Sequence, residues 1–312
     1  MGEVATHPHH HGPVHLDEAD WQEFAAQTEL EGELLIGFVT GTVERVKALR
    51  GPEAPQVHRV LDIGSGPGVG TCELARLFPE AHVVAVDGSP EMLSRVTRRA
   101  EEVGLGARIS THLAELPGGL DGLGPVDLIW ASMSLHHVGD EIGLLGILLA
   151  LLGPHGVLAV AEVADPMRVL PDDLDVGPPG LAGRLDHAGA TWFAAMRDGL
   201  TEAVPSMDLP SMLTSAGFEV LSSGVDRESF DPPLSETARQ TVLGHLRRVR
   251  QQLDELLDAD DLDALHVLGD EGDRRGVMRR SDVFVEASRE IVIARPAGHV
   301  ARRTGSGGAS TS

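Results

Sequence analysis

The chain has 312 residues, is strongly acidic and contains a single cysteine, Cys72. Its 48 Asp and Glu against 25 Lys and Arg give a formal net charge of −23. This balance argues against a nucleic-acid groove, which needs a cationic surface, and favours a small molecule or a protein as substrate. The lone cysteine excludes disulfides within the chain and thiolate metal clusters. No apolar run reaches the roughly 18–20 residues that span a bilayer, so we expect a cytoplasmic protein without a membrane segment.

Both ends of the chain are polar. Residues 1–20, which we expect to form a flexible tail, contain His7, His9, His10, His11 and His15. Histidine tracts bind zinc or nickel in some proteins, but no carboxylate or cysteine spacing fixes a geometry here, so we assign no metal site. Residues 298–312 lose all periodicity and are expected to be a disordered tail.

A helical segment is predicted ahead of the first strand. Apolar side chains recur at spacings of three and four within residues 21–50, which is typical of an amphipathic helix. Segments typical of strands and helices then alternate over residues 57–165. Near-continuous apolar strands alternating with helices predict a parallel sheet with helices on both faces, which binds ligands outside the carboxyl ends of its strands. This α/β core is predicted to continue at residues 209–230 and 281–297.

A glycine-rich turn follows the first apolar run of this core. The run ends at Ile63, the glycines stand at Gly64, Gly66 and Gly68, and a helical pattern follows over Thr71–Phe78. Glycine has no Cβ, so it adopts positive φ easily and lets the backbone approach a bound molecule. The free N–H groups at the start of the following helix face the same place. We therefore expect a nucleotide-type site at this turn.

The glycine spacing and a second acid narrow the type of nucleotide. The dinucleotide fingerprint G-x-G-x-x-G requires a glycine where this chain has Val69, which disfavours a dinucleotide-dependent oxidoreductase. The next apolar run ends in Asp87, directly before Gly88. A carboxylate at the carboxyl end of the second strand accepts two hydrogen bonds from a ribose diol.

The pattern D-x-G-x-G-x-G, from Asp62 to Gly68, followed by an acid that ends the next strand, resembles the class I S-adenosylmethionine-dependent methyltransferases, small-molecule methyltransferases among them. Three more segments are similar to that family in the family's order, namely 126–138 with its Leu-His-His, 148–162 and 215–218. The resemblance implies a Rossmann-like doubly wound sheet, mostly parallel with an antiparallel last strand. It also implies S-adenosyl-L-methionine as cofactor and S-adenosyl-L-homocysteine as product.

The resemblance places the cofactor on residues at the carboxyl ends of the first four strands. These are Asp62, Gly64, Ser65, Gly66, Gly68, Asp87, Gly88, His112, Leu113 and Ala131. The chain departs from the family after the third strand, where an acid usually receives the adenine amino group. His112 and Leu113 stand there instead, so adenine binding rests on backbone groups and apolar contact, unless Glu115 substitutes.

Methyl transfer needs the acceptor in line with the methyl–sulfur bond, and it needs a base when the acceptor is a hydroxyl, a thiol or a protonated amine. Histidine is the usual base at neutral pH. The candidate catalytic residues are His136 and His137 after the fourth strand, Glu162 at the end of the fifth, and His187 in an insertion. For the histidine pair, helix capping and loop packing is the alternative interpretation.

Aromatic and hydroxyl side chains near these positions are candidates for the substrate pocket. They are Trp130, Ser132, Trp192 and Phe193. An aromatic face attracts a sulfonium or a cationic acceptor, and plain wall or core packing is the alternative.

Two insertions interrupt the core at residues 166–208 and 231–280. Both emerge on the substrate side in the family that the chain resembles, so we interpret them as a helical cap; the alternative is a packing surface, such as that of a homodimer. The chain is thus predicted to transfer a methyl group from S-adenosylmethionine to a small organic molecule, with an O, N or C acceptor left open. One alternative is a protein that uses this cofactor structurally or electrostatically in a non-methylating reaction. The other is a dinucleotide-dependent oxidoreductase.

Overall fold

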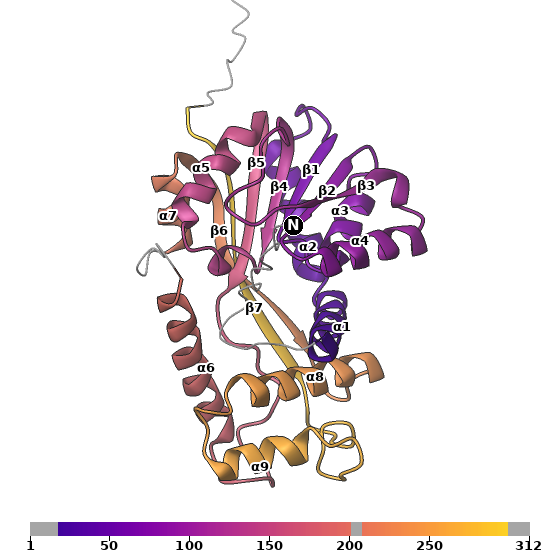
Figure 1. Ribbon diagram of the computed structural model, residues 1–312, viewed down its shortest axis with the longest axis vertical. Coiled ribbons are helices and arrows are strands. Elements are labelled where there is room, and N and C mark those ends of the chain that lie inside the picture. Colours follow the sequence, from indigo (N-terminus) through magenta and orange to yellow (C-terminus); the bar gives the residue numbers. More distant parts are fainter. Residues whose placement is uncertain (1–17, 201–207, 299–312) are drawn as a thin grey trace, which may run out of the picture.

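The computed structural model describes residues 18–200 and 208–298. The histidine tract and residues 299–312 of the expected C-terminal tail lie outside the described residues. A seven-stranded sheet with the order β3-β2-β1-β4-β5-β7-β6 forms the centre (Figure 1). The strands are β1 (Arg59–Ile63), β2 (His82–Asp87), β3 (Ile109–Leu113), β4 (Val126–Ser132), β5 (Leu152–Val163), β6 (Phe218–Phe230) and β7 (Val285–Pro296).

The strand directions agree with the predicted sheet. Neighbouring strands from β3 to β5 run parallel, whereas β7 is antiparallel to both β5 and β6. Both faces of the sheet are covered, because Val60 of β1 belongs to one apolar cluster and the next residue, Leu61, to another. A strand buried on both faces has no polar side, which explains the continuous apolar runs.

Helices from different parts of the chain cover the two faces. Side chains of α2 (Gly37–Arg50), α3 (Val69–Leu77) and α4 (Pro90–Glu102) pack on one face, and those of α5 (Glu141–Leu151) and α7 (Leu209–Ser215) pack on the other. Short 3₁₀ turns, η1 (Gly106–Arg108) and η2 (Leu135–His137), precede β3 and follow β4. The sheet therefore separates two apolar layers, in a doubly wound α/β architecture.

Capping side chains set the first residues of several helices. Ser89 Oγ accepts the Met92 N–H at 3.2 Å, with Pro90 as the first residue of α4. Asp140 accepts the Gly143 N–H at 2.8 Å at the start of α5. Each cap satisfies a backbone donor that has no partner within its own helix, so these helices begin at sharply defined residues.

A third layer of helices lies beyond the end of the sheet where β5 terminates (Figure 1). It consists of α6 (Leu181–Asp198), α8 (Glu236–Gln252) and α9 (Ala259–Leu268), and we call it the cap. Apolar side chains of these helices form a third core of their own. The strands β6 and β7 extend into this layer as a two-stranded ribbon, paired as far as Phe230 opposite Val285.

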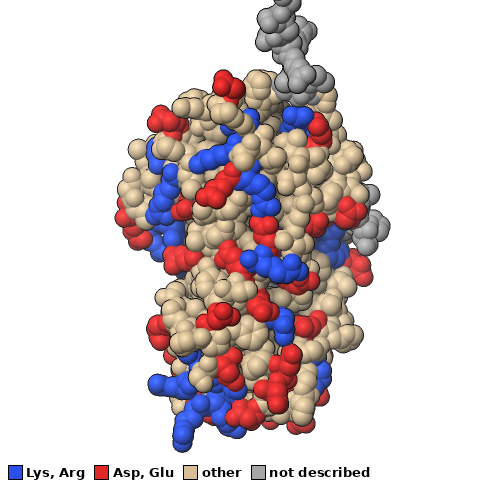
Figure 2. Space-filling view, turned by 180° about the vertical axis from the view of Figure 1, so that it is seen from behind, with Lys and Arg blue, Asp and Glu red and all other residues tan. Residues whose placement is uncertain are grey.

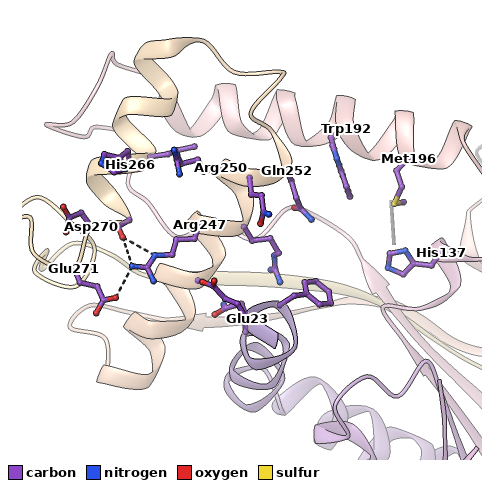
Figure 3. A pocket seen from close by; sticks show the side chains of 17 residues that line it. Glu23, His137, Trp192, Met196, Arg247, Arg250, Gln252, His266, Asp270 and Glu271 are labelled. Carbon is purple, nitrogen blue, oxygen red and sulfur yellow. Dashed lines mark hydrogen bonds and ion pairs between the residues drawn. The ribbon is translucent and has the colours of Figure 1, made fainter. Parts of the chain in front are cut away.

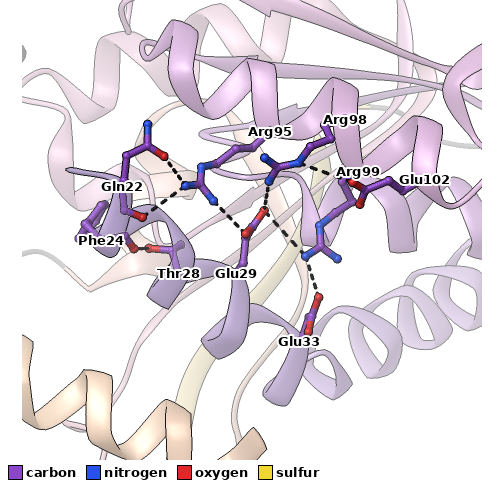
Figure 4. Close-up of polar contacts among 9 residues, drawn as sticks. All are labelled: Gln22, Phe24, Thr28, Glu29, Glu33, Arg95, Arg98, Arg99 and Glu102. Carbon is purple, nitrogen blue, oxygen red and sulfur yellow. Dashed lines mark hydrogen bonds and ion pairs between the residues drawn. The ribbon is translucent and has the colours of Figure 1, made fainter. Parts of the chain in front are cut away.

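Helix α1 (Glu18–Leu34) bridges the sheet layer and the cap. Figure 4 shows its ion pairs with α4, in which Arg95 Nη1 lies 2.9 Å from Glu29 Oε2 and Arg99 lies 2.7 Å from Glu33. On the cap side, Gln27 Nε2 donates to the Thr241 carbonyl at 2.8 Å. The predicted segment 21–50 is thus two helices, α1 and α2, and the first of them is fastened to both layers.

The surface carries charges of both signs. On the face shown in Figure 2, Lys and Arg side chains lie interspersed among Asp and Glu side chains. Within residues 18–200 and 208–298, no helix is both long enough and apolar enough to cross a membrane.

Candidate active site

The turn between β1 and α3 takes the strained backbone path that its glycines allow. The φ angles are 67° at Gly64, 51° at Gly66 and 86° at Gly68. The close approach of α4 also requires a glycine, because a Cβ on Gly68 would lie 2.9 Å from the Val96 Cα. The N–H of Gly64 donates to the carbonyl of Val86 at 2.8 Å, which fixes the turn against β2. The glycines therefore let the turn lie close against β2 and α4.

Asp62 lies beneath this turn and is only 3% exposed. The Thr71 hydroxyl donates to its Oδ2 at 2.6 Å. Burial raises the pKa of Asp62 to about 7, and the nearby charge of Asp87 also raises it, while the Thr71 hydrogen bond acts in the opposite direction. The carboxyl joins the end of β1 to the start of α3, and its charge responds to pH near neutrality.

Asp87 connects the turn to the next helix. Its Oδ2 accepts the Gly66 N–H and its Oδ1 accepts the Ser89 N–H, both at 2.9 Å. The residue is part-buried, so its carboxylate is not fully enclosed by the protein. Gly88, next along the chain, is exposed.

The end of β3 offers an apolar surface beside Asp87. Leu113 stands opposite Asp87 in the strand register, and its side chain is 57% exposed. A leucine this exposed at a strand end is suited to contact the flat face of a base. The neighbouring His112 is held back by a hydrogen bond between its Nε2 and the carbonyl oxygen of Gly119 at 2.7 Å. The Leu113 side chain is therefore open at this strand end, whereas the His112 ring is engaged with Gly119.

Two buried hydroxyls test whether the predicted cofactor fits this site. The Oγ atoms of Ser65 and Ser134 are buried and have no hydrogen-bond partner among the described residues. Ser134 packs against the turn, because a Cβ on Gly64, the chain neighbour of Ser65, would be 2.4 Å from the Ser134 Cβ. Unpaired buried hydroxyls are costly, and the carboxylate and ammonium of an amino acid supply partners for them. With Asp87 and Leu113, these residues fit an amino acid, a ribose and a base, the three parts of S-adenosylmethionine.

The loop after β4 has a strained backbone at its first residue. Met133 adopts φ 56°, a left-handed conformation that costs a residue with a side chain about 1–2 kcal/mol. Its N–H donates to the Ala161 carbonyl at 2.9 Å, which holds it in place. Such strain clusters at functional sites, and here it turns η2 toward the end of β5.

A histidine–glutamate pair follows in this loop. Glu162 Oε2 lies 2.6 Å from His136 Nδ1, and its Oε1 accepts the N–H groups of Ser134 and Leu135 at 3.1 and 2.9 Å. A carboxylate accepts hydrogen bonds, so it selects the tautomer with a proton on Nδ1. The Nε2 of His136 is then left as a proton acceptor. Both carboxylate oxygens of Glu162 are thus engaged, one with the His136 ring and the other with the loop backbone.

The cap reaches the same pair through α6. Arg197 Nη1 donates to the His136 carbonyl at 3.1 Å, and Arg197 also forms an ion pair with Glu141, whose side chain is only 2% exposed. The Phe193 ring lies 5.7 Å from the His136 ring. The position of α6 therefore fixes the backbone and one side of the His136 ring.

A cavity of 780 Å³ opens beside His137 (Figure 3). It lies between α1, α6, α8 and α9, and Figure 3 shows His137 and Met196 at one end and Arg247, with its partner Glu271, at the other. The residues that line it are Glu23, Phe24, Gln27, His137, Trp192, Met196, Gly244, Arg247, Arg248, Arg250, Gln251, Gln252, Leu265, His266, Gly269, Asp270 and Glu271. This volume suits a small organic molecule.

The residues predicted for the substrate pocket lie in different parts of the structure. Trp192 lines the cavity, and Ser132 is part-buried at the end of β4. Trp130 is 2% exposed and packs in the core under the glycine turn, because β4 is buried on both faces and turns this side chain inward. His187 lies on the exposed face of α6 and is absent from the linings of the three cavities described. We therefore keep Trp192 for the substrate pocket and move Trp130 to the core.

One predicted cofactor residue, Ala131, can meet a ligand only through its backbone. Several residues that line the larger cavity were not predicted from the sequence. Ala131 is fully buried in the second core cluster, so only its backbone is available to a ligand. Gln27 on α1 and the arginines of α8 were not predicted, because residues more than 200 positions apart meet in this cavity. The one feature of the sequence that marks the arginines of α8 is the run Arg247–Gln252, in which Val249 is the one apolar residue. Among residues 18–200 and 208–298, no group of three or more His, Cys, Asp or Glu side chains is placed to hold a metal ion.

Comparisons with known proteins agree with this geometry. A family described as a methyltransferase domain matches residues 60–156. Trans-aconitate 2-methyltransferase from Methylobacterium radiotolerans is 36% identical over 144 residues, which cover 43% of this chain and 52% of that relative. The protein of the same name from Variovorax paradoxus is 38% identical over 106 residues, which cover 34% and 39%. The chain thus spans about half or less of the length of these curated relatives.

One solved structure is also similar to this chain. It is a SAM-dependent methyltransferase from Geobacter sulfurreducens in complex with S-adenosyl-L-homocysteine, with a TM-score of 0.45 and 16% identity, covering 81% of this chain and 90% of that one.

Proposed function

We propose that the chain is a class I S-adenosylmethionine-dependent methyltransferase that methylates a small organic molecule bound in the 780 Å³ cavity. The match of residues 60–156 to a methyltransferase domain supports this proposal. One observation carries the proposal. The loop after β4 touches both sites, since Ser134 packs against Gly64 of the turn and His137 lines the cavity. A cofactor at the turn and an acceptor in the cavity would then meet at this loop.

The residues at the strand ends hold the cofactor in this proposal. Asp87 receives the ribose hydroxyls, Leu113 contacts the adenine, and Ser65 and Ser134 bond the amino-acid end. When bound, S-adenosylmethionine supplies an electrophilic methyl group on a sulfonium. Helix α1, fastened across α4 and against α8, closes the same end of the sheet and limits the access of water.

In this proposal His136 is the general base when the acceptor carries a proton. Its ring does not line the cavity, but the ring centroid lies 4.1 Å from that of His137, which does. Glu162 holds the Nδ1–H, so Nε2 accepts the proton of a hydroxyl, a thiol or an amine. A carboxylate acceptor needs no such base. The relatives named trans-aconitate 2-methyltransferase make trans-aconitate the first acceptor to test.

Calorimetric titration with S-adenosylmethionine and S-adenosylhomocysteine, followed by labelled-methyl transfer to trans-aconitate and a panel of small acids, alcohols and amines, tests the proposal. We expect His136→Gln to bind the cofactor normally. Turnover of a hydroxyl or amine acceptor should fall about 10²–10⁴-fold, and turnover of a carboxylate acceptor should not fall. His187→Gln, on the exposed face of α6 and outside the linings of the three cavities described, is the matched control. Cofactor binding without methyl release to any acceptor would instead favour a non-methylating use of the cofactor.

A further inference from the structure

Gln27 of α1 is a polar side chain in the wall of the 780 Å³ cavity. Only 7% of the residue is exposed. Its Nε2 donates to the Thr241 carbonyl of α8 at 2.8 Å, and a carbonyl oxygen can only accept hydrogen bonds. This bond therefore fixes the orientation of the amide, with Nε2 on Thr241 and Oε1 on the other side of the group.

Helix α8 accommodates this amide at a glycine. Gly244 stands in the interior of α8 and also lines the cavity. A Cβ on Gly244 would overlap the Gln27 side-chain oxygen, and it would lie only 2.8 Å from Nε2, the farther of the two polar atoms. Glycine inside a helix is less favourable than alanine. The position of the Gln27 amide thus depends on a residue that is otherwise unfavourable in this helix.

The Gln27 side-chain oxygen accepts no hydrogen bond from the residues that the structure describes. Unlike the enclosed hydroxyl oxygens of Ser65 and Ser134, it is not sealed by protein atoms, so a molecule in the cavity can reach it. An amide oxygen accepts up to two hydrogen bonds. A ligand that displaces water from such an oxygen without replacing the hydrogen bond loses affinity.

The charged groups that line the cavity leave it without an excess of positive charge. Two of the three arginines in the lining form ion pairs, Arg247 with Glu271 at 3.0 Å and Arg248 with a glutamate of α1 at 2.7 Å. The lining also contains the carboxylates of Glu23 and Asp270, which offset the third arginine. These charges favour a neutral ligand. A carboxylate, which has only acceptors, does not suit the Gln27 oxygen.

We propose that Gln27 is a specificity-determining residue, whose Oε1 accepts a hydrogen bond from a hydroxyl or an N–H group of a neutral methyl acceptor. This inference rests on the proposed function, since it takes the occupant of the cavity to be the methyl acceptor. Phe24, Trp192 and Met196 in the same lining supply apolar contacts for the rest of the molecule. The acceptor class is thus a neutral alcohol, phenol or amide with an apolar body.

Binding of 2-phenylethanol and benzyl methyl ether to the full chain tests this role. The two probes are isomers with the same atoms, and only the alcohol has a hydrogen-bond donor. We expect the wild type to bind the alcohol about 10-fold more tightly than the ether in calorimetric titrations. The alcohol should also shift the side-chain amide resonances of Gln27 in a nitrogen-labelled sample, assigned through the backbone resonances of α1.

Gln27→Met should bind both isomers equally, because it keeps the length of the side chain and removes the amide. Gly244→Ala should also lose the preference, because its Cβ displaces the Gln27 oxygen, and it serves if the methionine variant fails to fold. Gln251→Met, which removes an exposed amide of the same lining, is the control that should keep the preference.

Three results would overturn the role of Gln27. They are a wild type that does not prefer the alcohol, Gln27 amide resonances that the alcohol leaves unmoved, and a preference that persists in Gln27→Met or Gly244→Ala. These measurements involve no methyl transfer, so their failure is distinct from failure of the proposed function.

Discussion

Replacing Asp62 by asparagine should make the protein more stable at alkaline pH. The folded protein binds a proton at Asp62 more tightly than the unfolded chain, because burial raises the pKa from 3.8 to about 7. The stability that this carboxyl contributes is therefore full below pH 3.8 and is lost as pH rises through about 7. The whole difference corresponds to about 4 kcal/mol. Asparagine stays neutral and keeps an oxygen for the Thr71 hydroxyl, so it avoids this loss.

Urea unfolding of the wild type and Asp62→Asn at pH 4.5 and pH 8.5 measures the effect. The unfolding free energy of Asp62→Asn minus that of the wild type should be about 3 kcal/mol larger at pH 8.5 than at pH 4.5, since all other groups titrate alike in both proteins. Thr71→Val should have the opposite effect and make the unfolding free energy depend more strongly on pH. The Thr71 hydrogen bond lowers the pKa of Asp62 in the wild type, so its loss should raise that pKa further. Parallel stability curves for the wild type and Asp62→Asn would refute the reasoning, since they would mean that the buried carboxyl titrates as it does in the unfolded chain.

Two further predictions concern the site. Asp87→Ala should weaken binding of S-adenosylhomocysteine more than 10-fold in calorimetry, because the ribose acceptor and the bonds to the Gly66 and Ser89 N–H groups are lost together; Asp121→Ala, an exposed carboxylate, should leave affinity unchanged. Arg197→Ala should lower the unfolding free energy by about 3 kcal/mol in urea, because it removes a cation from the buried Glu141, and Arg197→Ala with Glu141→Gln should recover part of that loss. Equal stabilities of the single and double variants would argue against a buried ion pair.

The sheet and the glycine turn could be predicted from the sequence because their signals are local. Glycines at fixed spacing and an acid at the end of an apolar run fall within about thirty residues, and the chain from 60 to 156 matches a family over this stretch. The side-chain direction at Trp130 could not be predicted. Strand β4 is buried on both faces, so its pattern has no alternation that would show which way a residue points.

The cap was harder to predict, because its parts meet only in three dimensions. The outer half of β6, from Val225 to Phe230, alternates exposed and part-buried residues, but polar side chains dominate it and hide the strand. The lining of the larger cavity combines α1 with α8, and the pair Gln27 and Thr241 is 214 residues apart. Contacts of this range have no periodic signature in a single sequence.

The cap is attached to the sheet at the edge that β6 and β7 form, away from the strands that carry the glycine turn. The helices α8 and α9 enter the chain after β6 and leave it before β7, and α6 enters after β5, all next to the same edge of the sheet. The glycine turn, Asp87 and Leu113 lie on strands at the other edge or in the middle of the sheet. If the proposed function holds, exchange of the cap between relatives would alter the chamber for the acceptor while keeping the glycine turn, Asp87 and Leu113 in place. Only the contacts of α6 with His136 and of α8 with α1 would have to be kept.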